Sequence, residues 1–418
     1  MSRPAFDPDK LRTQGPLEGR IPPLREHLRP LFALLRTLRP ILHVPNQSLV
    51  VVTRYDDVAE VLTNDSAFGV PYGAKIRGLA GRNFLLGFDN GGQYRRDRAL
   101  MMRVFPLSDV SSLANFAAQR AERILIDNPA GVDAMKVLVT PILVDMCRDY
   151  FGVLVEDPEF PLWAMAASGY LFAPYGETAV QRAQGEAGAQ RLCAVVDRSI
   201  EHAHRRTADG PSNVIERLVA LRTADRGEPD DATIRALIVT MIVALVPTST
   251  LAAGNMLEML LRRADMMAVA QAAAHTDDDD LLRRCLFEVL RFLPASPVWP
   301  RDCKGDGARG AFVLAPGTWH ATRIREGMRV LAATQSAMFD SRRVPKPRRF
   351  DPERPADHSM VFGYGLHRCF GAAIAWKVLP AILKPLLRRP TLARAPGADG
   401  RRRFYGIFPE KLSVTYQS

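Results

Sequence analysis

The chain has 418 residues, of which 47% are hydrophobic, and its formal net charge at pH 7 is +11. This length would allow two or three domains, and the composition can bury a substantial core. The basic residues are dispersed and accompany no recognised nucleic-acid motif, so the charge indicates solubility or an acidic partner rather than nucleic-acid binding. The five cysteines include no CxxC pair, which gives no support to a zinc ribbon or a thioredoxin-like redox motif.

The N-terminal region, Met1 to Pro30, is polar and rich in Pro and Arg. It contains no apolar signal core and no membrane anchor, so we expect a cytoplasmic protein. Nothing in the sequence requires more than a monomer. Further along, Leu49–Thr53 predicts a strand and Tyr55–Leu62 a helix, whereas the glycine-dense segment Phe68–Gly92 predicts a long loop.

Helical patterns dominate from Arg95 to Phe292. The most apolar segment among them is Ile234–Leu261, whose run Ala236–Val246 is shorter than the ~20 residues that span a bilayer. It therefore predicts a helix buried in the core. Pro247 removes one helix hydrogen bond and its ring clashes with the carbonyl four residues back, so we expect a break there.

Shorter elements follow in the C-terminal half. The acidic run Asp277–Asp280 predicts a helix start, because negative charge is stabilised near the positive end of a helix dipole. Ala311–Leu314 and Trp319–Thr322 are strand-like and have turn residues between them. Another apolar helix is predicted at Ala372–Leu379.

Cys369 lies just before that last helix, in the segment Phe362-Gly363-Tyr364-Gly365-Leu366-His367-Arg368-Cys369-Phe370-Gly371. Glycines let the backbone turn tightly and approach a flat group without Cβ clashes. The helix start would direct N–H groups and positive charge at the sulfur, which lowers the pKa of the thiol and favours the thiolate. The other four cysteines lie in apolar or mixed patterns typical of buried structural residues: Cys147, Cys193, Cys285 and Cys303.

The segment around Cys369 resembles the haem-binding loop of the cytochrome P-450 family at the aromatic, the two preceding glycines, the His, the Cys and the closing Gly. The resemblance covers nearly the whole chain and implies one haem domain over residues 1–418. The implied fold is mainly α with small β-sheets, a triangular helical domain that holds haem b between a long central helix and the helix after the Cys loop. Cys369 would then ligate the iron, and the neighbouring cofactor-binding residues would be Phe362, Gly363, Gly365, His367 and Gly371.

The resemblance extends to a charge network. Glu288 and Arg291 lie three residues apart on one helix face, and alone they would be a surface pair worth ~0.3–0.5 kcal/mol. In the family such a pair bonds to a second Arg, which here would be Arg354 in Phe350-Asp351-Pro352-Glu353-Arg354. The three residues would then form a buried structural triad.

Haem propionates are carboxylates, for which Arg is the best geometric match. By resemblance the donors are His367, Arg301 and the pair Tyr94 and Arg98, whose spacing places both on one helix face. The family often has Trp or His where this chain has Tyr94, and Tyr keeps a hydroxyl donor.

The segment Ala244-Leu245-Val246-Pro247-Thr248 departs most from the family, which usually has a small residue, Gly, any residue, an acid and Thr. By resemblance Ala244, Pro247 and Thr248 are the catalytic positions. Thr248 keeps the alcohol, but Pro247 cannot titrate, so proton delivery would depend on Thr248, Ser249 or Thr250 and water. Either Pro247 only kinks the helix, or oxygen arrives already reduced as a peroxide.

The resemblance also places a substrate pocket. Its walls would come from the loop before Tyr94, the connection Tyr170–Tyr175, the stretch Ser296–Trp299 and a turn near the C-terminus, together with Ala244 and Thr248. These residues are apolar or weakly polar, which favours a lipophilic small-molecule substrate. The candidates are Phe84, Leu85, Leu86, Phe172, Pro297, Val298, Ile407 and Phe408.

Three functions remain open at this point. The first is a monooxygenase fed by an acidic ferredoxin-type electron donor, for which Arg95, Arg96, Arg368 and Lys377 are candidate contacts. The second is a peroxygenase or a fatty-acyl hydroperoxide-rearranging enzyme on the same fold, favoured by Pro247. The third is a haem sensor or carrier without turnover.

Overall fold

The computed structural model describes residues 5–13, 23–173, 176–206, 210–224, 228–305 and 310–417. The chain forms two compact units. Unit 1 comprises Met1–Gly19, Tyr72–Gly254 and Ala373–Ser418, and unit 2 comprises Arg20–Pro71 and Asn255–Ala372.

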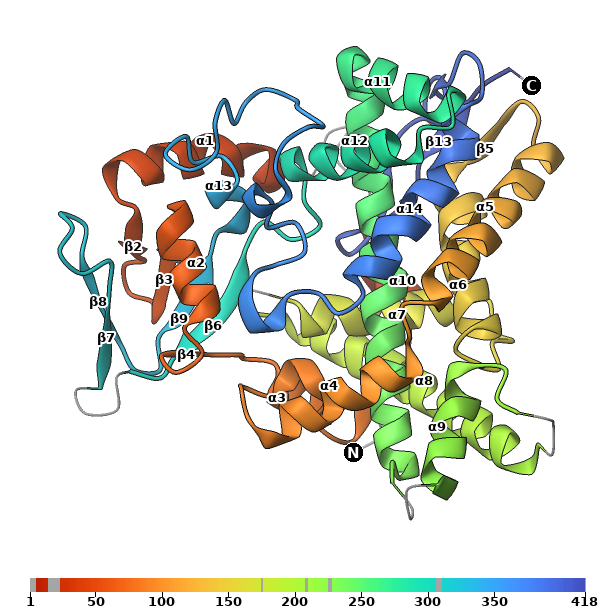
Figure 1. The fold of residues 1–418 in the computed structure, drawn as a ribbon, viewed down its shortest axis with the longest axis horizontal. Helices are drawn as coiled ribbons and strands as arrows, with labels where there is room; N and C mark the ends of the chain where they lie inside the picture. Colours follow the sequence, from red (N-terminus) through yellow and green to blue (C-terminus); the bar gives the residue numbers. More distant parts are fainter. Residues whose placement is uncertain are drawn as a thin grey trace. The chain divides into compact units, whose positions relative to one another are not determined.

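Unit 1 is mainly helical (Figure 1). It also contains two antiparallel three-stranded sheets, with strand orders β1-β11-β12 and β10-β13-β5. Its helices are η1 (Pro8–Leu11), α3 (Gly73–Ala80), η2 (Leu85–Gly87), α4 (Gly92–Val104), α5 (Asp109–Asp127), η3 (Ala134–Val139), α6 (Thr140–Asp149), α7 (Phe160–Leu171), α8 (Ala179–Arg205), α9 (Val214–Ala224), α10 (Asp231–Arg262, whose last residues belong to unit 2) and α14 (Ala372–Leu387). Its strands are β1 (Arg12–Thr13), β5 (Gly131–Asp133), β10 (Ala393–Arg394), β11 (Arg403–Tyr405), β12 (Phe408–Lys411) and β13 (Ser413–Thr415).

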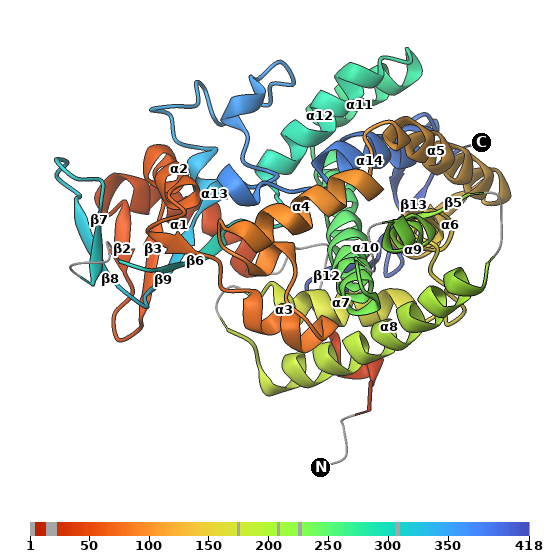
Figure 2. The same cartoon turned by 60° about the horizontal axis from the view of Figure 1, so that its bottom comes forward.

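The helix pair α7 and α8 packs closely, and Figure 2 shows α3 beside them. A Cβ atom on Gly188 of α8 would come within 2.7 Å of the Trp163 carbonyl oxygen on α7. Because no other residue would fit without displacing backbone, Gly188 sets how near these two helices approach.

The prediction of a loop over Phe68–Gly92 is wrong in part, since this segment contains β4 (Phe68–Gly69), α3 and η2. The helix α3 buries Ile76, Leu79 and Ala80 and packs against α8. This tertiary packing outweighs the low helix propensity of its two glycines.

The helix α10 runs through Pro247 without interruption, so the predicted break is wrong. Proline removes a single hydrogen bond, while the buried side chains of Val243 and Val246 before it and of Leu251 after it hold the helix on both sides. Length and composition would let α10 cross a membrane, yet 78% of its most apolar window is buried, as in a core helix.

Unit 2 combines a sheet with helices. The five-stranded sheet has the order β2-β3-β9-β6-β4, in which β3 and β9 are parallel and the other pairs antiparallel. Its elements are α1 (Pro23–Leu38), β2 (Ile41–His43), β3 (Leu49–Val52), α2 (Tyr55–Thr63), β4, α11 (Ala264–His275), α12 (Asp279–Phe292), β6 (Trp299–Cys303), β7 (Ala311–Leu314), β8 (Thr322–Arg325), β9 (Arg329–Ala332), α13 (Thr334–Ala337), η4 (Ala356–His358) and η5 (Gly365–His367).

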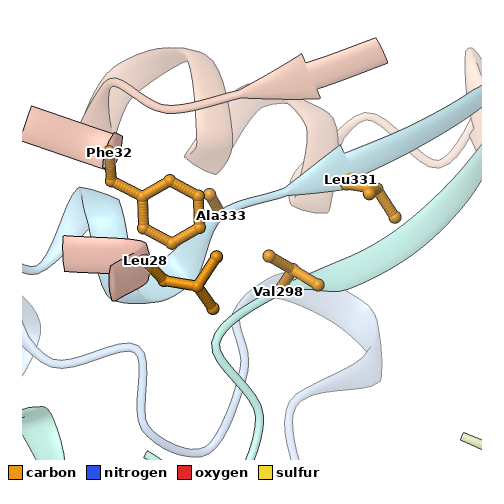
Figure 3. Close-up of a cluster of buried hydrophobic side chains, with 5 residues drawn as sticks. All are labelled: Leu28, Phe32, Val298, Leu331 and Ala333. Atoms are coloured by element: carbon orange, nitrogen blue, oxygen red, sulfur yellow. The ribbon is translucent and has the colours of Figure 1, made fainter. Parts of the chain in front are cut away.

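A hydrophobic cluster joins α1 to this sheet (Figure 3). Leu28 and Phe32 of α1 meet Val298, Leu331 and Ala333, and all five are buried. Val298 is 1% exposed. The side chain of Val298 thus belongs to the core of unit 2, and its place in a substrate pocket stays a prediction.

Several predicted boundaries are confirmed by the structure. The strand and helix expected after Leu49 are β3 and α2, and Asp278 caps α12 by accepting a hydrogen bond from the Leu281 N–H. One hairpin strand is displaced: β7 lies where expected, but β8 begins only at Thr322. The N–H groups of Thr318 and Ala321 bond to carbonyls three residues back, so the preceding residues form turns instead.

Candidate functional site

The segment that carries Cys369 is a closed loop in unit 2. The Cys369 N–H donates to the Phe362 carbonyl oxygen over 2.9 Å, and the Arg368 N–H donates to the Gly365 carbonyl oxygen over 3.1 Å. The main chain therefore fixes the position of Cys369.

Two glycines permit this path. Gly363 and Gly365 have φ angles of +74° and +72°, in the region that favours glycine. A Cβ atom on Gly365 would also lie 2.2 Å from the carbonyl oxygen of Leu62, at the end of α2. At the start of the loop, the Phe362 ring packs on Phe287 of α12 with 5.2 Å between ring centroids. The loop is thus anchored to two helices of unit 2.

Cys369 is exposed, whereas Cys147, Cys285 and Cys303 are buried. The surrounding protein raises the pKa of the Cys369 thiol, while the Gly371 N–H and the Arg368 guanidinium act to lower it. The net direction is opposite to the sequence prediction, although contact with solvent limits the increase. A metal ion at the sulfur would deprotonate it outright.

A network of charges lies in the same unit and includes Glu288 of α12, the residue after Phe287, which contacts the loop. Arg291 binds Glu288 with two parallel hydrogen bonds, Nε to Oε2 over 2.9 Å and Nη2 to Oε1 over 2.7 Å. Arg354 Nε donates to Glu288 Oε1 over 3.2 Å, and so does the Asp351 N–H. The three charged side chains are 1%, 6% and 5% exposed for Arg291, Glu288 and Arg354, so the ion pairs are shielded from water.

Tyr94 and Arg98 lie one turn apart on α4, in unit 1. Arg98 Nη1 donates to the Tyr94 hydroxyl over 3.5 Å, and Tyr94 is 3% exposed. The other two predicted propionate donors are in unit 2, where Arg301 is buried in β6 and His367 is half-buried in η5. Arg301 Nη1 also donates to the Pro300 carbonyl oxygen over 2.9 Å.

Asp97 on α4 is a residue that the sequence reasoning missed. It is 3% exposed and accepts hydrogen bonds from the Leu85 N–H over 3.0 Å and from Gln93 over 2.7 Å. Burial raises the pKa of Asp97, and these donors oppose that increase. An acid three residues after Tyr94, on the apolar face of a helix, was the available signal. Asp97 ties the loop that carries Phe84, Leu85 and Leu86 to α4.

The three positions predicted to be catalytic, here called the distal positions, lie in the part of α10 that belongs to unit 1. Ala244 and Thr248 are half-buried, and Pro247 is buried. The Thr248 hydroxyl donates to the Ala244 carbonyl oxygen, and the buried Thr250 lies 3.4 Å from the Thr140 hydroxyl on α6. Of the three predicted hydroxyls, Thr250 is therefore held by a neighbouring helix, and Thr248 presents its oxygen as an acceptor.

Some predicted substrate residues of unit 1 gather at the end of α7. The Phe172 ring stacks edge-on to Tyr72 with centroids 5.8 Å apart, and Phe408 Cε2 approaches Gly169, 3.8 Å from where a Cβ atom would be. Ile407 is 40% exposed beside it. In unit 2, the Pro297 carbonyl accepts a hydrogen bond from the Gln335 N–H over 3.0 Å. Positions 174 and 175 of the predicted Tyr170–Tyr175 connection lie outside the described residues.

Lys75 of α3 makes a second contact that the sequence did not indicate. Its Nζ donates to Glu177 Oε2 and to the Tyr170 carbonyl oxygen, both over 2.9 Å. The hydrogen bond from Lys75 lowers the pKa of Glu177. The pair joins α3 to the chain between α7 and α8, next to Phe172.

The family model described as Cytochrome P450 matches residues 183–406. The Vitamin D(3) 25-hydroxylase of Pseudonocardia autotrophica is 24% identical over 381 residues, 88% of each chain. Cytochrome P450 107B1 of Saccharopolyspora erythraea is 28% identical over 393 residues, 87% of this chain and 88% of that protein. The structure of CYP109E1 from Bacillus megaterium in complex with testosterone superimposes with a TM-score of 0.78 at 20% identity, over 95% of this chain and 99% of that one.

Proposed function

Because this chain belongs to the cytochrome P450 family, a group of haem-thiolate oxidoreductases that bind haem b through a cysteine, we propose that it is a monooxygenase acting on a lipophilic small molecule. The observation that carries the proposal is the cysteine loop, where an exposed Cys369 is fixed by backbone hydrogen bonds and by two glycines. These features fit haem, because the cysteine is accessible and the positive φ angles of the two glycines give the tight turn that positions it as an iron ligand. We further propose that residues 1–418 act as one cytoplasmic, monomeric haem domain.

When bound, the haem supplies the electronic chemistry of oxygen-atom insertion. We assign to Cys369 the role of iron ligand and to Arg301, His367, Tyr94 and Arg98 that of propionate donors, since guanidinium, imidazole and hydroxyl groups all donate to carboxylates. The electron donor would be an acidic ferredoxin-type protein, in keeping with the +11 charge of the chain.

Oxygen activation consumes protons. In this chain, residues of α10 would have to deliver them. Pro247 has neither an N–H nor a titratable group. The Thr248 hydroxyl donates its hydrogen to the Ala244 carbonyl oxygen. Its oxygen can still accept a hydrogen bond from a water molecule, but its hydrogen is not available to a bound substrate or oxygen. Ser249 is buried, as is Thr250. Proton delivery would then depend on water positioned by Thr248.

This dependence favours a second candidate, a peroxygenase or hydroperoxide-rearranging enzyme, for which a peroxide brings an O–O bond already reduced. The test compares the wild type, Pro247→Asp and Pro247→Ala on one bound substrate, driven once by a ferredoxin system with reductant and once by peroxide. Pro247→Ala restores the helix N–H without adding an acid, so it separates the effect of the backbone from that of the carboxyl group.

If the distal helix limits proton delivery, Pro247→Asp should increase coupled turnover with dioxygen, and Pro247→Ala should not. Efficient, well-coupled turnover of the wild type with dioxygen and no activity with peroxide would rule out the second candidate. Haem-loaded protein that turns over by neither route would instead support a sensor or carrier.

A further inference from the structure

A concave pocket lies in unit 2, and no residue of the cysteine loop lines it. Its volume is about 670 Å³, within the range of small-molecule sites. One wall is the side of α1 that carries Ala33, Arg36 and Thr37, and the other is the segment Phe339–Arg349 that follows α13. Figure 1 shows α1 beside α13, where this segment begins.

The lining of the pocket is strongly basic. Asp340 is the only acid among the lining residues. Five lining side chains are cationic: Arg36, Arg342, Lys346, Arg348 and Arg349. Asp340 is already engaged, because its Oδ1 accepts from Arg342 Nη1 over 3.0 Å and its Oδ2 from the Tyr55 N–H over 3.1 Å. Within the part of the chain that the structure describes, no ion pair is found for the side chains of Lys346, Arg348 or Arg349. The pocket therefore carries positive charge that its own carboxylate does not cancel.

The positive charge of the pocket contributes to lowered pKa values of two neighbouring arginines, Arg29 and Arg36. Burial lowers the pKa of Arg29, which stacks on Phe339, to about 10, and Arg291, Arg348, Arg263 and Arg36 add to the decrease. Burial also lowers the pKa of Arg36; Asp340 opposes this decrease, and Arg342 and Arg348 add to it. A cation disfavours a neighbouring cation unless an anion lies between them.

Hydrogen bonds from two arginines, Arg291 and Arg354, hold the backbone of the segment that carries the cationic side chains. Arg291 Nη1 donates to the Pro347 carbonyl oxygen over 2.7 Å, and Arg354 Nη1 donates to that of Pro345 over 2.8 Å. Both arginines also bind the Arg349 carbonyl, over 3.2 and 3.0 Å. With its carbonyls fixed, the segment presents Lys346, Arg348 and Arg349 from a preorganised main chain, which reduces the entropy lost on binding.

We propose that this pocket binds a multiply charged phosphate chain, as found in inorganic polyphosphate or in a nucleoside di- or triphosphate. Arg342 is paired with Asp340, and the remaining three guanidinium groups and one ammonium call for several anionic groups rather than one. The planar, forked guanidinium matches phosphate oxygens in pairs. This inference is independent of the oxygen chemistry, because none of its residues belongs to the haem or distal positions.

The experiment uses isothermal titration of the haem-loaded protein with tripolyphosphate, ATP and inorganic phosphate at constant ionic strength. The test variant is Arg348→Gln with Arg349→Gln. The matched control is Arg123→Gln with Arg198→Gln, two exposed arginines on α5 and α8 that remove the same charge from unit 1. Equal haem content in the three proteins shows that all are folded.

We expect saturable binding of tripolyphosphate to the wild type and to the control, and an affinity at least about tenfold lower in the test variant, since each hydrogen bond to a charged group is worth that much or more. Inorganic phosphate should bind more weakly than tripolyphosphate. Tighter binding of ATP than of tripolyphosphate would identify a nucleotide as the source of the phosphate chain.

Three results would overturn the inference. One is the absence of saturable binding by the wild type. Another is an equal loss of affinity in the test and control variants, which would show that the net charge alone attracts the anion. The third is binding of ATP without binding of tripolyphosphate, since recognition would then rest on the nucleoside.

Discussion

The loop around Cys369 and the stretch of α10 around Pro247 differ in how well their residues suit the local backbone conformation. In the loop, two glycines with positive φ angles and a hydrogen bond from the Cys369 N–H to the Phe362 carbonyl oxygen fix the main-chain conformation. In α10, a residue that cannot donate a hydrogen bond is placed inside a helix that continues regardless. A motif of local backbone requirements can be recognised from sequence, whereas the effect of proline depends on how well its surroundings hold the helix.

The two regions also differ in their polar support. Behind the loop, Glu288 binds two arginines that in turn bind the carbonyls of the segment Pro345–Arg349. Around Pro247, the described polar contacts are a threonine bonded to its own helix and another threonine beside α6. We therefore expect substitutions near the loop to cost much more than substitutions near the proline.

Replacing Cys369 by Ser should have the largest effect. The variant should lose the thiolate-haem spectrum completely, because a hydroxyl is a much weaker acid than a thiol and cannot supply a thiolate ligand. The measurement is the difference spectrum of the ferrous carbon-monoxide complex. Cys193→Ala, at a half-buried position on α8, is the control and should retain the spectrum. A normal thiolate band in the Cys369 variant would show that another residue ligates the iron.

Replacing Glu288 by Ala should be the next most severe change. It leaves Arg291 buried without its anion, at a cost of about 3–5 kcal/mol of unfolding free energy. The control is Glu353→Ala, whose exposed carboxylate binds Arg284 over 3.0 Å and should contribute about 0–1 kcal/mol. Denaturant unfolding and the yield of haem-loaded protein measure both. Equal stability of the two variants would mean that the buried network does not support the loop.

Replacing Pro247 by Ala should change stability little. Restoring the N–H and removing the ring clash gains about 3 kcal/mol in a helix interior. Against this, the buried ring loses two carbons at about 0.8 kcal/mol each, and the unfolded chain regains freedom worth about 0.4–1 kcal/mol. The net change should stay within about 1 kcal/mol in urea unfolding. A gain near the full 3 kcal/mol would show that the buried proline ring contributes little to the packing of α10.

Sequence and structure agree most where the signal is local. The cap at Asp278, the helix after Cys369 and the strand at Leu49 could all be predicted from a few neighbouring residues. The helix α3 could not, because its stability comes from packing against α8, far along the chain. The same holds for Val298, whose place in a core cluster depends on α1, and for the cationic pocket, which joins Arg36 to residues more than three hundred positions away.

The smallest predicted effect concerns a partly buried charge pair in the helical unit. Lys75 and Glu177 have side chains 20% and 11% exposed, so solvent weakens their attraction, and Glu177→Gln should cost about 0.2–1 kcal/mol at pH 7. The hydrogen bond from Lys75 lowers the pKa of Glu177 below its usual 4.5, so the ionised carboxylate stabilises the folded state above that value. This contribution is lost as the pH falls through the lower pKa of the folded protein.

The difference in unfolding free energy between the wild type and Glu177→Gln should therefore be present at pH 7 and shrink steadily on acidification below about 4.5. Urea unfolding at a series of pH values measures it. Glu201→Gln is the control, because the Glu201 pair with Arg205 on α8 is largely exposed and joins residues of one helix only. If the Glu177 difference instead grew as the pH fell, the carboxylate would be destabilising in its ionised form. The link between α3 and the chain before α8 would then have to rest on the bond from Lys75 to the Tyr170 carbonyl alone.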